Sequence, residues 1–143
     1  MNIAIVGATG NVGRKTLEVF DKKNFKFDNL YLVASEKSAG KKISFRDKEY
    51  VIENLETYDF SKADITFFAA GGTIAEKFAE KAAKHTIVID NSSFFRMDPD
   101  VPLIVPQVNA SEIKNMKKNI IANPNCSTAQ LVIALKPLHN LFK

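Results

Sequence analysis

The chain has 143 residues, with 20 Lys and Arg against 16 Asp and Glu, and therefore a formal net charge of +4. An apolar content of 45% with so small a net charge excludes intrinsic disorder and fits one globular domain, or a piece of a larger protein. No apolar run approaches the roughly 18 residues that a membrane-spanning helix needs, and no basic flank of a secretory signal precedes the first apolar run.

Short apolar runs without a polar side predict strands that are covered on both faces. These strands are expected at Asn2–Val6, Leu30–Ala34, Ile65–Ala70, Thr86–Ile89 and Asn119–Ala122. The shorter segments Ile43–Phe45 and Val51–Ile52 suit a hairpin or an edge pair.

Helical patterns lie between and after these strands. The first two helices have apolar faces made of Gly13, Leu17 and Phe20 and of Ile74, Phe78 and Ala82. A third helix is expected over Ala110–Lys117, with Ser111 or Asn109 as its cap. A fourth is expected over Ser127–Leu141, kinked or loosened near Pro137. The alternation of strands and helices predicts a doubly wound α/β domain with a mostly parallel sheet.

Charge and cysteine content narrow the class of ligand. The lysines are spread along the chain without an aromatic-interleaved stripe, which favours solvated faces over a nucleic-acid surface. The one cysteine cannot form an internal disulfide, so a reducing, cytoplasmic location is expected. We therefore expect a small-molecule substrate, and neither a nucleic acid, a membrane nor a metal ion.

A glycine-rich segment, GATGNVG, follows the first expected strand directly. Gly7 allows a sharp turn off the strand, Gly10 lets the backbone approach a pyrophosphate, and Gly13 lets the helix lie close to the sheet. The start of that helix offers free N–H groups to the phosphates. This context predicts a dinucleotide-binding domain of Rossmann type rather than a turn without a ligand. The other residues expected to line the turn are Thr9, Asn11 and Val12.

The end of the second expected strand indicates which dinucleotide binds. An NAD site usually has an acidic residue there for the ribose 2′-hydroxyl. Ser35, Lys37 and Ser38 stand there instead, and their hydroxyls and positive charge suit a 2′-phosphate. Glu36 does not fit this interpretation unless it points to solvent. NADP is therefore favoured over NAD, and a polar loop without a ligand is the alternative.

Cys126 lies between the last expected strand and the last expected helix. A thiolate at a helix N-terminus is stabilised by unpaired N–H groups and the helix dipole. Open α/β sheets also bind their ligands at the carboxyl ends of their strands. The position therefore predicts a nucleophile that forms a thiohemiacetal and an acyl-enzyme beside a nicotinamide. A buried core cysteine is the alternative, which the polar neighbours of Cys126 disfavour.

Six segments carry a resemblance to a known family: GATGNVG at 7–13, ASEKSAGK at 34–41, FFAAGG at 67–72, DNSSFFRMD at 90–98, VPLIVPQVN at 101–109 and NPNCSTAQ at 123–130. In these segments the chain resembles aspartate-semialdehyde dehydrogenases. The resemblance implies NADP-dependent, reversible reductive dephosphorylation of L-aspartyl 4-phosphate to L-aspartate 4-semialdehyde. The pathways implied are the biosynthesis of lysine, threonine, methionine and diaminopimelate.

The resemblance also implies roles for individual residues. Cys126 matches the nucleophile, Asn125 a residue that lines the substrate and thioester, and Arg96 an arginine that binds the phosphate group. The remaining matches are Gly71, Gly72 and Thr73 beneath the cofactor, with Asn91 and Ser92 near the nicotinamide. Lys37 stands where many relatives have arginine, and Gln107 where an acidic residue is common.

Parts of the family's machinery are missing from the sequence. The family takes its general base, a histidine, from a second domain that also provides most of the dimer interface. Neither His85, at the amino-terminal edge of the expected sheet, nor His139, far along the last helix, can replace it. Residues 1–143 therefore read as the dinucleotide-binding domain of a fragment that binds NADP with little turnover, while the full-length enzyme is expected to be a dimer or tetramer.

Two other functions remain open. N-acetyl-glutamyl-phosphate reductase has a similar design, but it usually has Gly-Cys-Tyr-Pro-Thr around its thiol, unlike Asn125-Cys126-Ser127-Thr128 here. A nucleotide-sensing module without chemistry is the other alternative. The reactivity of Cys126 distinguishes the sensor from the enzyme.

Overall fold

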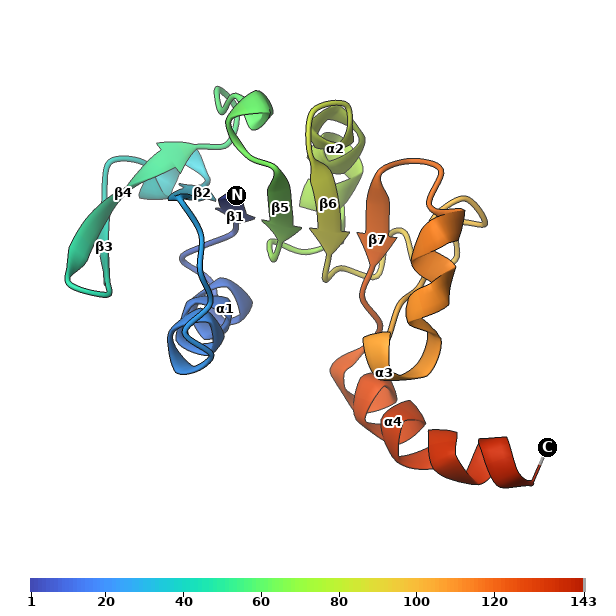
Figure 1. Ribbon diagram of the computed structural model, residues 1–143. Helices are drawn as coiled ribbons and strands as arrows, with labels where there is room; N and C mark the ends of the chain where they lie inside the picture. Colours follow the sequence, from blue (N-terminus) through green and yellow to red (C-terminus); the bar gives the residue numbers. More distant parts are fainter. Residues whose placement is uncertain (143) are drawn as a thin grey trace.

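The computed structural model describes residues 1–142, within which seven strands form one sheet in the spatial order β3-β4-β2-β1-β5-β6-β7 (Figure 1). The strands are β1 Asn2–Val6, β2 Asn29–Ala34, β3 Lys42–Phe45, β4 Lys48–Asn54, β5 Ile65–Phe68, β6 Ile87–Asp90 and β7 Ile120–Ala122. The helices are α1 Asn11–Lys22, α2 Gly72–Ala83, α3 Pro106–Asn109 and α4 Cys126–Leu141. Turns of 3-10 helix span Glu36–Ser38, Phe60–Lys62 and Ala110–Asn115.

The strand order confirms the predicted doubly wound α/β fold. All neighbouring strands pair in parallel except β3 and β4, which form the expected hairpin at one edge. From β1 the chain builds outward to β2 and β4, then returns to the other side of β1 with β5, β6 and β7. The order therefore reverses between β1 and β5, and such a switch point opens a crevice at the carboxyl ends of the strands.

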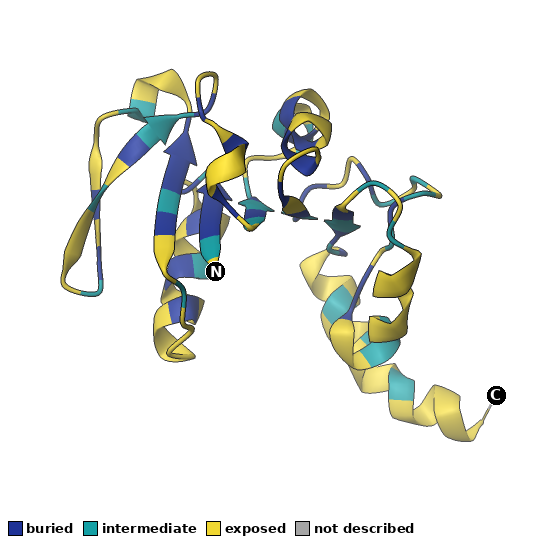
Figure 2. Cartoon of the chain, turned by 45° about the horizontal axis from the view of Figure 1, so that its top comes forward, coloured by how far each residue is buried: buried dark blue, intermediate teal, exposed yellow. Residues whose placement is uncertain are grey.

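The buried apolar residues form two clusters, one around α1 and one around α2. Figure 2 shows that the strands at the centre of the sheet are mostly buried, whereas α4 is mostly exposed. Successive residues of β1 face opposite sides: Ile3 and Ile5 join the cluster around α1, while Ala4 and Val6 join the cluster around α2. Because β1 is buried on both faces, its run of apolar residues without alternation is explained. The helices α1 and α2 thus cover opposite faces of the sheet, as a doubly wound fold requires.

One part of the sheet is less covered than the rest. Ile87, Ile89 and Ile121 lie on the face of β6 and β7 that is turned away from α2. Ile87 is 38% exposed, and Ile89 and Ile121 are half-buried. Within residues 1–142, α1 covers this face only near β1, β2 and β5, where Phe67 packs against its cluster.

Several expected element boundaries are wrong. The fifth strand ends at Phe68 rather than Ala70, and the sixth spans Ile87–Asp90 rather than Thr86–Ile89. Asn119 does not belong to β7 because its φ of 54° lies in the left-handed region, which strands do not use. These shifts are small because the apolar runs themselves are where the sequence places them.

The third helix is also not the one expected. Residues 106–115 form the short α3 and a 3-10 turn instead of an α-helix over Ala110–Lys117. Neither Asn109 nor Ser111 caps that turn by a side-chain hydrogen bond. The Asn109 amide instead accepts from the Val105 N–H and donates to the Leu103 carbonyl, each at 2.9 Å, so it stabilises the start of α3. The last helix begins at Cys126 and runs through Pro137 to Leu141.

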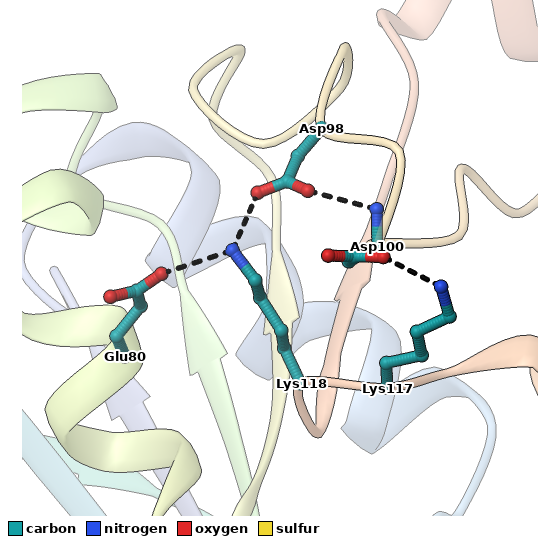
Figure 3. A network of polar contacts seen from close by, with 5 residues as sticks. All are labelled: Glu80, Asp98, Asp100, Lys117 and Lys118. Carbon is teal, nitrogen blue, oxygen red and sulfur yellow. Dashed lines mark hydrogen bonds and ion pairs between the residues drawn. The ribbon is translucent and has the colours of Figure 1, made fainter.

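A network of ion pairs holds the loop between β6 and β7 (Figure 3). Lys118 Nζ lies 2.9 Å from Asp98 Oδ2 and 3.3 Å from Glu80 Oε1, so it joins this loop to α2. Asp98 also accepts the Asp100 N–H, and Asp100 pairs with Lys117 at 2.8 Å. Hydrogen bonds from Lys118 and Asp100 hold the pKa of the Asp98 carboxyl below its ordinary value, and those to Asp98 and Glu80 raise the pKa of Lys118.

We predict that Asp98→Asn destabilises the chain in a pH-dependent way. Since the pKa of Asp98 is lower folded than unfolded, its ionised form stabilises the fold above the ordinary value of 3.8, and this stability is lost as pH falls through the lowered pKa. Urea unfolding between pH 2.5 and pH 7 should give wild type a higher free energy of unfolding than the variant at neutral pH. At the acid end of this range the two free energies of unfolding should be equal. A difference that is the same at every pH contradicts the pairing, and Glu76→Gln is a control that removes an exposed carboxylate from α2.

Candidate active site and dinucleotide cleft

The turn between β1 and α1 is built on two glycines that the protein's own packing requires. Gly7 has a φ of 85°, and a Cβ there would lie 2.8 Å from the main-chain carbonyl of Ala69. A Cβ on Gly13 would lie 2.4 Å from the Gly7 carbonyl oxygen. At Gly10 a Cβ would meet only that same oxygen at 3.4 Å, so no protein contact demands glycine. The absence of a side chain at Gly10 therefore leaves space that a bound ligand could occupy.

The start of α1 has features that suit an anion. Gly10 is the N-cap and provides no side-chain hydrogen bond, and the first turn carries no acidic residue. The N–H groups at Asn11 and Val12 therefore have neither a side-chain cap nor a neighbouring negative charge from the helix itself. Such a helix start favours a phosphate group.

A cleft of two adjoining cavities runs along the carboxyl ends of β1, β2 and β5. The first, of about 370 Å³, is lined by Gly7, Thr9 and Gly10 of the turn and by Ser35 after β2. The second, of about 420 Å³, is lined by Lys37 among others. The residues that line both cavities are Ser35, Leu55 and Ile74.

Not every predicted cofactor residue lines this cleft. Asn11 and Val12 line a different cavity, of about 490 Å³, on the α1 side of the sheet. Gly13 is buried, as its close contact with Gly7 requires. Ser38 lines neither part of the cleft, and its N–H donates to the Ser35 carbonyl within the turn. Glu36 is exposed, as expected, although it also lies beside Lys37 among the residues that line the second cavity.

The predicted loop Gly71–Thr73 lies between Ala70 and Ile74, which both line the first cavity. Gly71 has a φ of 87° and is the N-cap of α2, again without a side-chain cap. A glycine is needed there for the backbone conformation. The three residues of the loop therefore border the cleft without lining it.

Arg96 is held by main-chain acceptors only. Its Nε donates to the Asn123 carbonyl at 3.0 Å and its Nη2 to the Asn91 carbonyl at 3.1 Å. The side chain is half-buried, and no carboxylate within residues 1–142 forms an ion pair with it. Because both partners are main-chain carbonyls, no carboxylate offsets the positive charge of the guanidinium, and its remaining N–H donors can bind an anion.

Asn91 and Ser92 differ in what they offer a ligand. Asn91 is half-buried, lines the cavity next to Asn11, and its Oδ1 accepts from Asn123 Nδ2 at 2.8 Å. Ser92 is buried, and its hydroxyl donates to Asp90 Oδ2 at 2.6 Å while it accepts the Phe94 N–H. The Ser92 hydroxyl therefore stabilises the turn after β6. Neither Asp90, which is fully buried, nor Asn123 was predicted as a site residue, because only their tertiary hydrogen bonds reveal them.

Cys126 is exposed and is the first residue of α4. The Asn125 side chain caps this helix by accepting the Ser127 N–H at 2.9 Å, and its Oδ1 lies 4.0 Å from Sγ. The parallel register pairs Asp90 with Ala122, so the loops after β6 and β7 leave the sheet at the same edge. The thiol and the guanidinium of Arg96 therefore belong to neighbouring loops.

Neither histidine lies at this edge. His85 is in the turn that leads into the amino end of β6. His139 is in the last turn of α4, about 20 Å along the helix from Cys126 at roughly 1.5 Å per residue. Gln107 is an exposed residue of α3. Residues 1–142 contain no group of three potential metal ligands, and none of their helices is long and apolar enough to cross a membrane.

Comparison with known proteins places this geometry among semialdehyde dehydrogenases. Residues 2–116 match the family described as semialdehyde dehydrogenase, NAD binding domain. The aspartate-semialdehyde dehydrogenase of Aquifex aeolicus is 53% identical over 141 residues, which are 96% of this chain and 42% of the relative.

Solved structures of aspartate-semialdehyde dehydrogenases also resemble this chain in fold and sequence. Aspartate semialdehyde dehydrogenase II from Vibrio cholerae, complexed with ASA, has a TM-score of 0.91 and 48% identity over 97% of this chain and 46% of its own. The enzyme from Candida albicans, solved with NADP, has a TM-score of 0.76 and 30% identity over 99% of this chain and 47% of its own. The chain thus spans less than half the length of these relatives.

The different surroundings of Gly10 and Gly13 predict different outcomes for the same substitution. Gly13→Ala should destabilise the fold by about 1–3 kcal/mol, because the new methyl group overlaps the Gly7 carbonyl. Gly10→Ala should leave the urea midpoint close to that of wild type and weaken the binding of a nicotinamide dinucleotide about tenfold or more, because the methyl group would fill the space that a phosphate needs. Fluorescence titration measures the binding. Wild-type affinity in Gly10→Ala, or wild-type stability in Gly13→Ala, contradicts these assignments.

Proposed function

The chain belongs to the semialdehyde dehydrogenase family through its NAD binding domain, and from this premise we propose that it is the cofactor-binding, thiol-bearing part of an aspartate-semialdehyde dehydrogenase. The reaction is the reversible reductive dephosphorylation of L-aspartyl 4-phosphate to L-aspartate 4-semialdehyde. One observation carries the proposal: Arg96, a half-buried cation without a carboxylate partner, donates to the carbonyl of Asn123, three residues before the exposed thiol of Cys126 at a helix start. An acyl phosphate needs such a pair, a nucleophile for its carbonyl carbon and a cation for its phosphate.

The proposed chemistry assigns one task to each of these groups. The Cys126 thiolate attacks the acyl carbon, a C–S bond forms, and the C–O bond to phosphate breaks. Arg96 neutralises the leaving phosphate with its free N–H donors. The Asn125 side chain, 4.0 Å from Sγ, borders the thioester that results. When bound, the nicotinamide dinucleotide supplies the hydride that reduces this thioester, and collapse of the product frees the aldehyde and the thiolate.

The cleft fits a dinucleotide on this chain's own geometry. Gly10 leaves open space beside the uncapped start of α1, where a pyrophosphate would accept N–H groups. The adjoining cavity at Ser35 and Lys37 suits an adenosine ribose with a 2′-phosphate, because a cation and a hydroxyl line it. We therefore propose NADP as the cofactor, with Lys37 as the charge that selects it over NAD. Glu36 and Glu56 in the same cavity oppose this selection, and the Lys77 pair at 2.7 Å partly offsets Glu56.

The proposal leaves the general base outside residues 1–142, because both histidines lie away from Cys126. The isolated chain is accordingly expected to bind NADP with little turnover. We place the full-length enzyme in the cytoplasm, as a homo-oligomer in the biosynthesis of lysine, threonine, methionine and diaminopimelate. Its substrate is a small molecule, and it has no nucleic-acid partner. An N-acetyl-glutamyl-phosphate reductase is not favoured, since the relatives described above are aspartate-semialdehyde dehydrogenases. A nucleotide sensor without chemistry has no need for a thiol and a guanidinium on neighbouring loops.

Two alkylating reagents of similar size can test whether the guanidinium of Arg96 places positive charge near the thiol of Cys126. Iodoacetate is anionic and iodoacetamide is neutral, so the ratio of their rates at Cys126, relative to free cysteine, reports the local positive charge. We predict a raised ratio in wild type and a fall of about threefold to tenfold in Arg96→Gln. Arg14→Gln removes the same charge from exposed α1 and should leave the ratio unchanged. Equal ratios in wild type and Arg96→Gln contradict the proposed phosphate site.

Cofactor selection gives a second prediction. Lys37→Gln should weaken NADPH binding about tenfold, through the loss of one charged contact, and leave NADH binding unchanged. Calorimetric titration of the 143-residue chain measures both. Lys22→Gln, at the far end of α1, is the matched control. Wild-type chain that binds NADH as tightly as NADPH contradicts the proposed selection.

A further inference from the structure

A hydrogen bond between two side-chain amides joins the ends of β6 and β7, and the proposed reaction assigns it no role. Asn91 is the first residue after β6 and Asn123 the first after β7. Asn123 Nδ2 donates to Asn91 Oδ1 at 2.8 Å, and the Asn123 N–H donates to the Asp90 carbonyl, also at 2.8 Å. The main-chain bond continues the ladder of the sheet by one step. The side-chain bond goes further and fixes the separation of the two loops that leave the sheet.

The position of Arg96 depends on that separation. Its two acceptors are the main-chain carbonyls of Asn91 and Asn123, the two residues that the bridge joins. If the loops move apart, the guanidinium can keep one of these bonds but not both. Residues 1–142 offer Arg96 no carboxylate that would hold it in the absence of the bridge.

The position of Cys126 depends on the same residue. Only Pro124 and Asn125 separate Asn123 from the thiol. Pro124 is buried and its ring fixes φ, while the Asn125 side chain is bound to the Ser127 N–H. The segment from Asn123 to the start of α4 is therefore short and constrained. A shift of Asn123 is transmitted to the thiol and to the guanidinium together.

We propose that Asn123 is a positioning residue: its side-chain amide, through Asn91, holds the anion-binding guanidinium of Arg96 beside the thiol of Cys126. The inference rests on the proposed function, since it presumes that the two groups act on one acyl phosphate. Asn123 acts on the reaction through Arg96. Loss of its amide weakens phosphate binding more than it weakens the fold.

The alkylation ratio of iodoacetate to iodoacetamide tests this directly, because a merely structural role does not change the charge near the thiol. Asn123→Ala keeps the main-chain N–H and carbonyl and removes only the amide. Its ratio is expected to fall about threefold to tenfold, toward that of Arg96→Gln. Inorganic phosphate, as a competing anion, should slow the iodoacetate reaction of wild type at several-fold lower concentration than that of Asn123→Ala.

Asn119→Gly is the matched control. Asn119 lies at the opposite end of β7, its amide donates to the Ala83 carbonyl at 3.1 Å, and glycine preserves its left-handed backbone. The control removes a comparable bond, and its ratio is expected to equal that of wild type. Asn91→Ala removes the acceptor of the bridge and should lower the ratio as Asn123→Ala does, with no further fall in the double variant. If Asn123→Ala does not fold, the ratio of the single variant Asn91→Ala tests the positioning role in its place.

The outcomes separate the inference from the proposed function. A wild-type ratio equal to that of Arg96→Gln overturns the phosphate site, and the positioning role with it. A wild-type ratio that depends on Arg96 but survives both Asn123→Ala and Asn91→Ala overturns the positioning role alone. A fall in Asn119→Gly as large as in Asn123→Ala shows a general loss of structure and also overturns it.

Discussion

The parallel pairing of β1, β5, β6 and β7 is the constraint on which the rest of this structure depends. Because the strands share one direction, every loop that follows a strand leaves the sheet at the same edge. The turn after β1, the Arg96 loop after β6 and the Cys126 loop after β7 are far apart in sequence, but all three lie at that edge. Without this pairing, the anion site, the guanidinium and the thiol would be unrelated surface features. With it, they form one candidate site.

The fold and the parts of the site nearest to strand ends could be predicted from the sequence. Apolar runs located the strands, and Gly7 and Gly13 identified the turn because close backbone contacts leave no room for a side chain. The position of Cys126 followed from the same logic. Each of these features depends on the local geometry of the chain, which the spacing of residues along the sequence is enough to predict.

The parts that could not be predicted depend on partners distant in the chain. Asn109 looked like a helix cap, but its amide binds residues of the preceding loop instead. Asn123 joins Asn91, 32 positions earlier, and only the register of β6 and β7 brings the two amides together. Ser35 lines the cleft and Ser38 does not, although both lie in the same short segment after β2. Sequence spacing places a residue near a site, and tertiary hydrogen bonds decide what its side chain does there.

We infer that the dinucleotide cleft and the thiol of Cys126 form a single site at one edge of the sheet. A methylthio group carrying ¹³C, attached to Cys126 by disulfide exchange, tests it in the complex with NADP⁺. The account predicts nuclear Overhauser effects between this methyl group and protons of the nicotinamide ring. A saturated complex in which the methyl group contacts only adenine protons, or no cofactor proton, contradicts it.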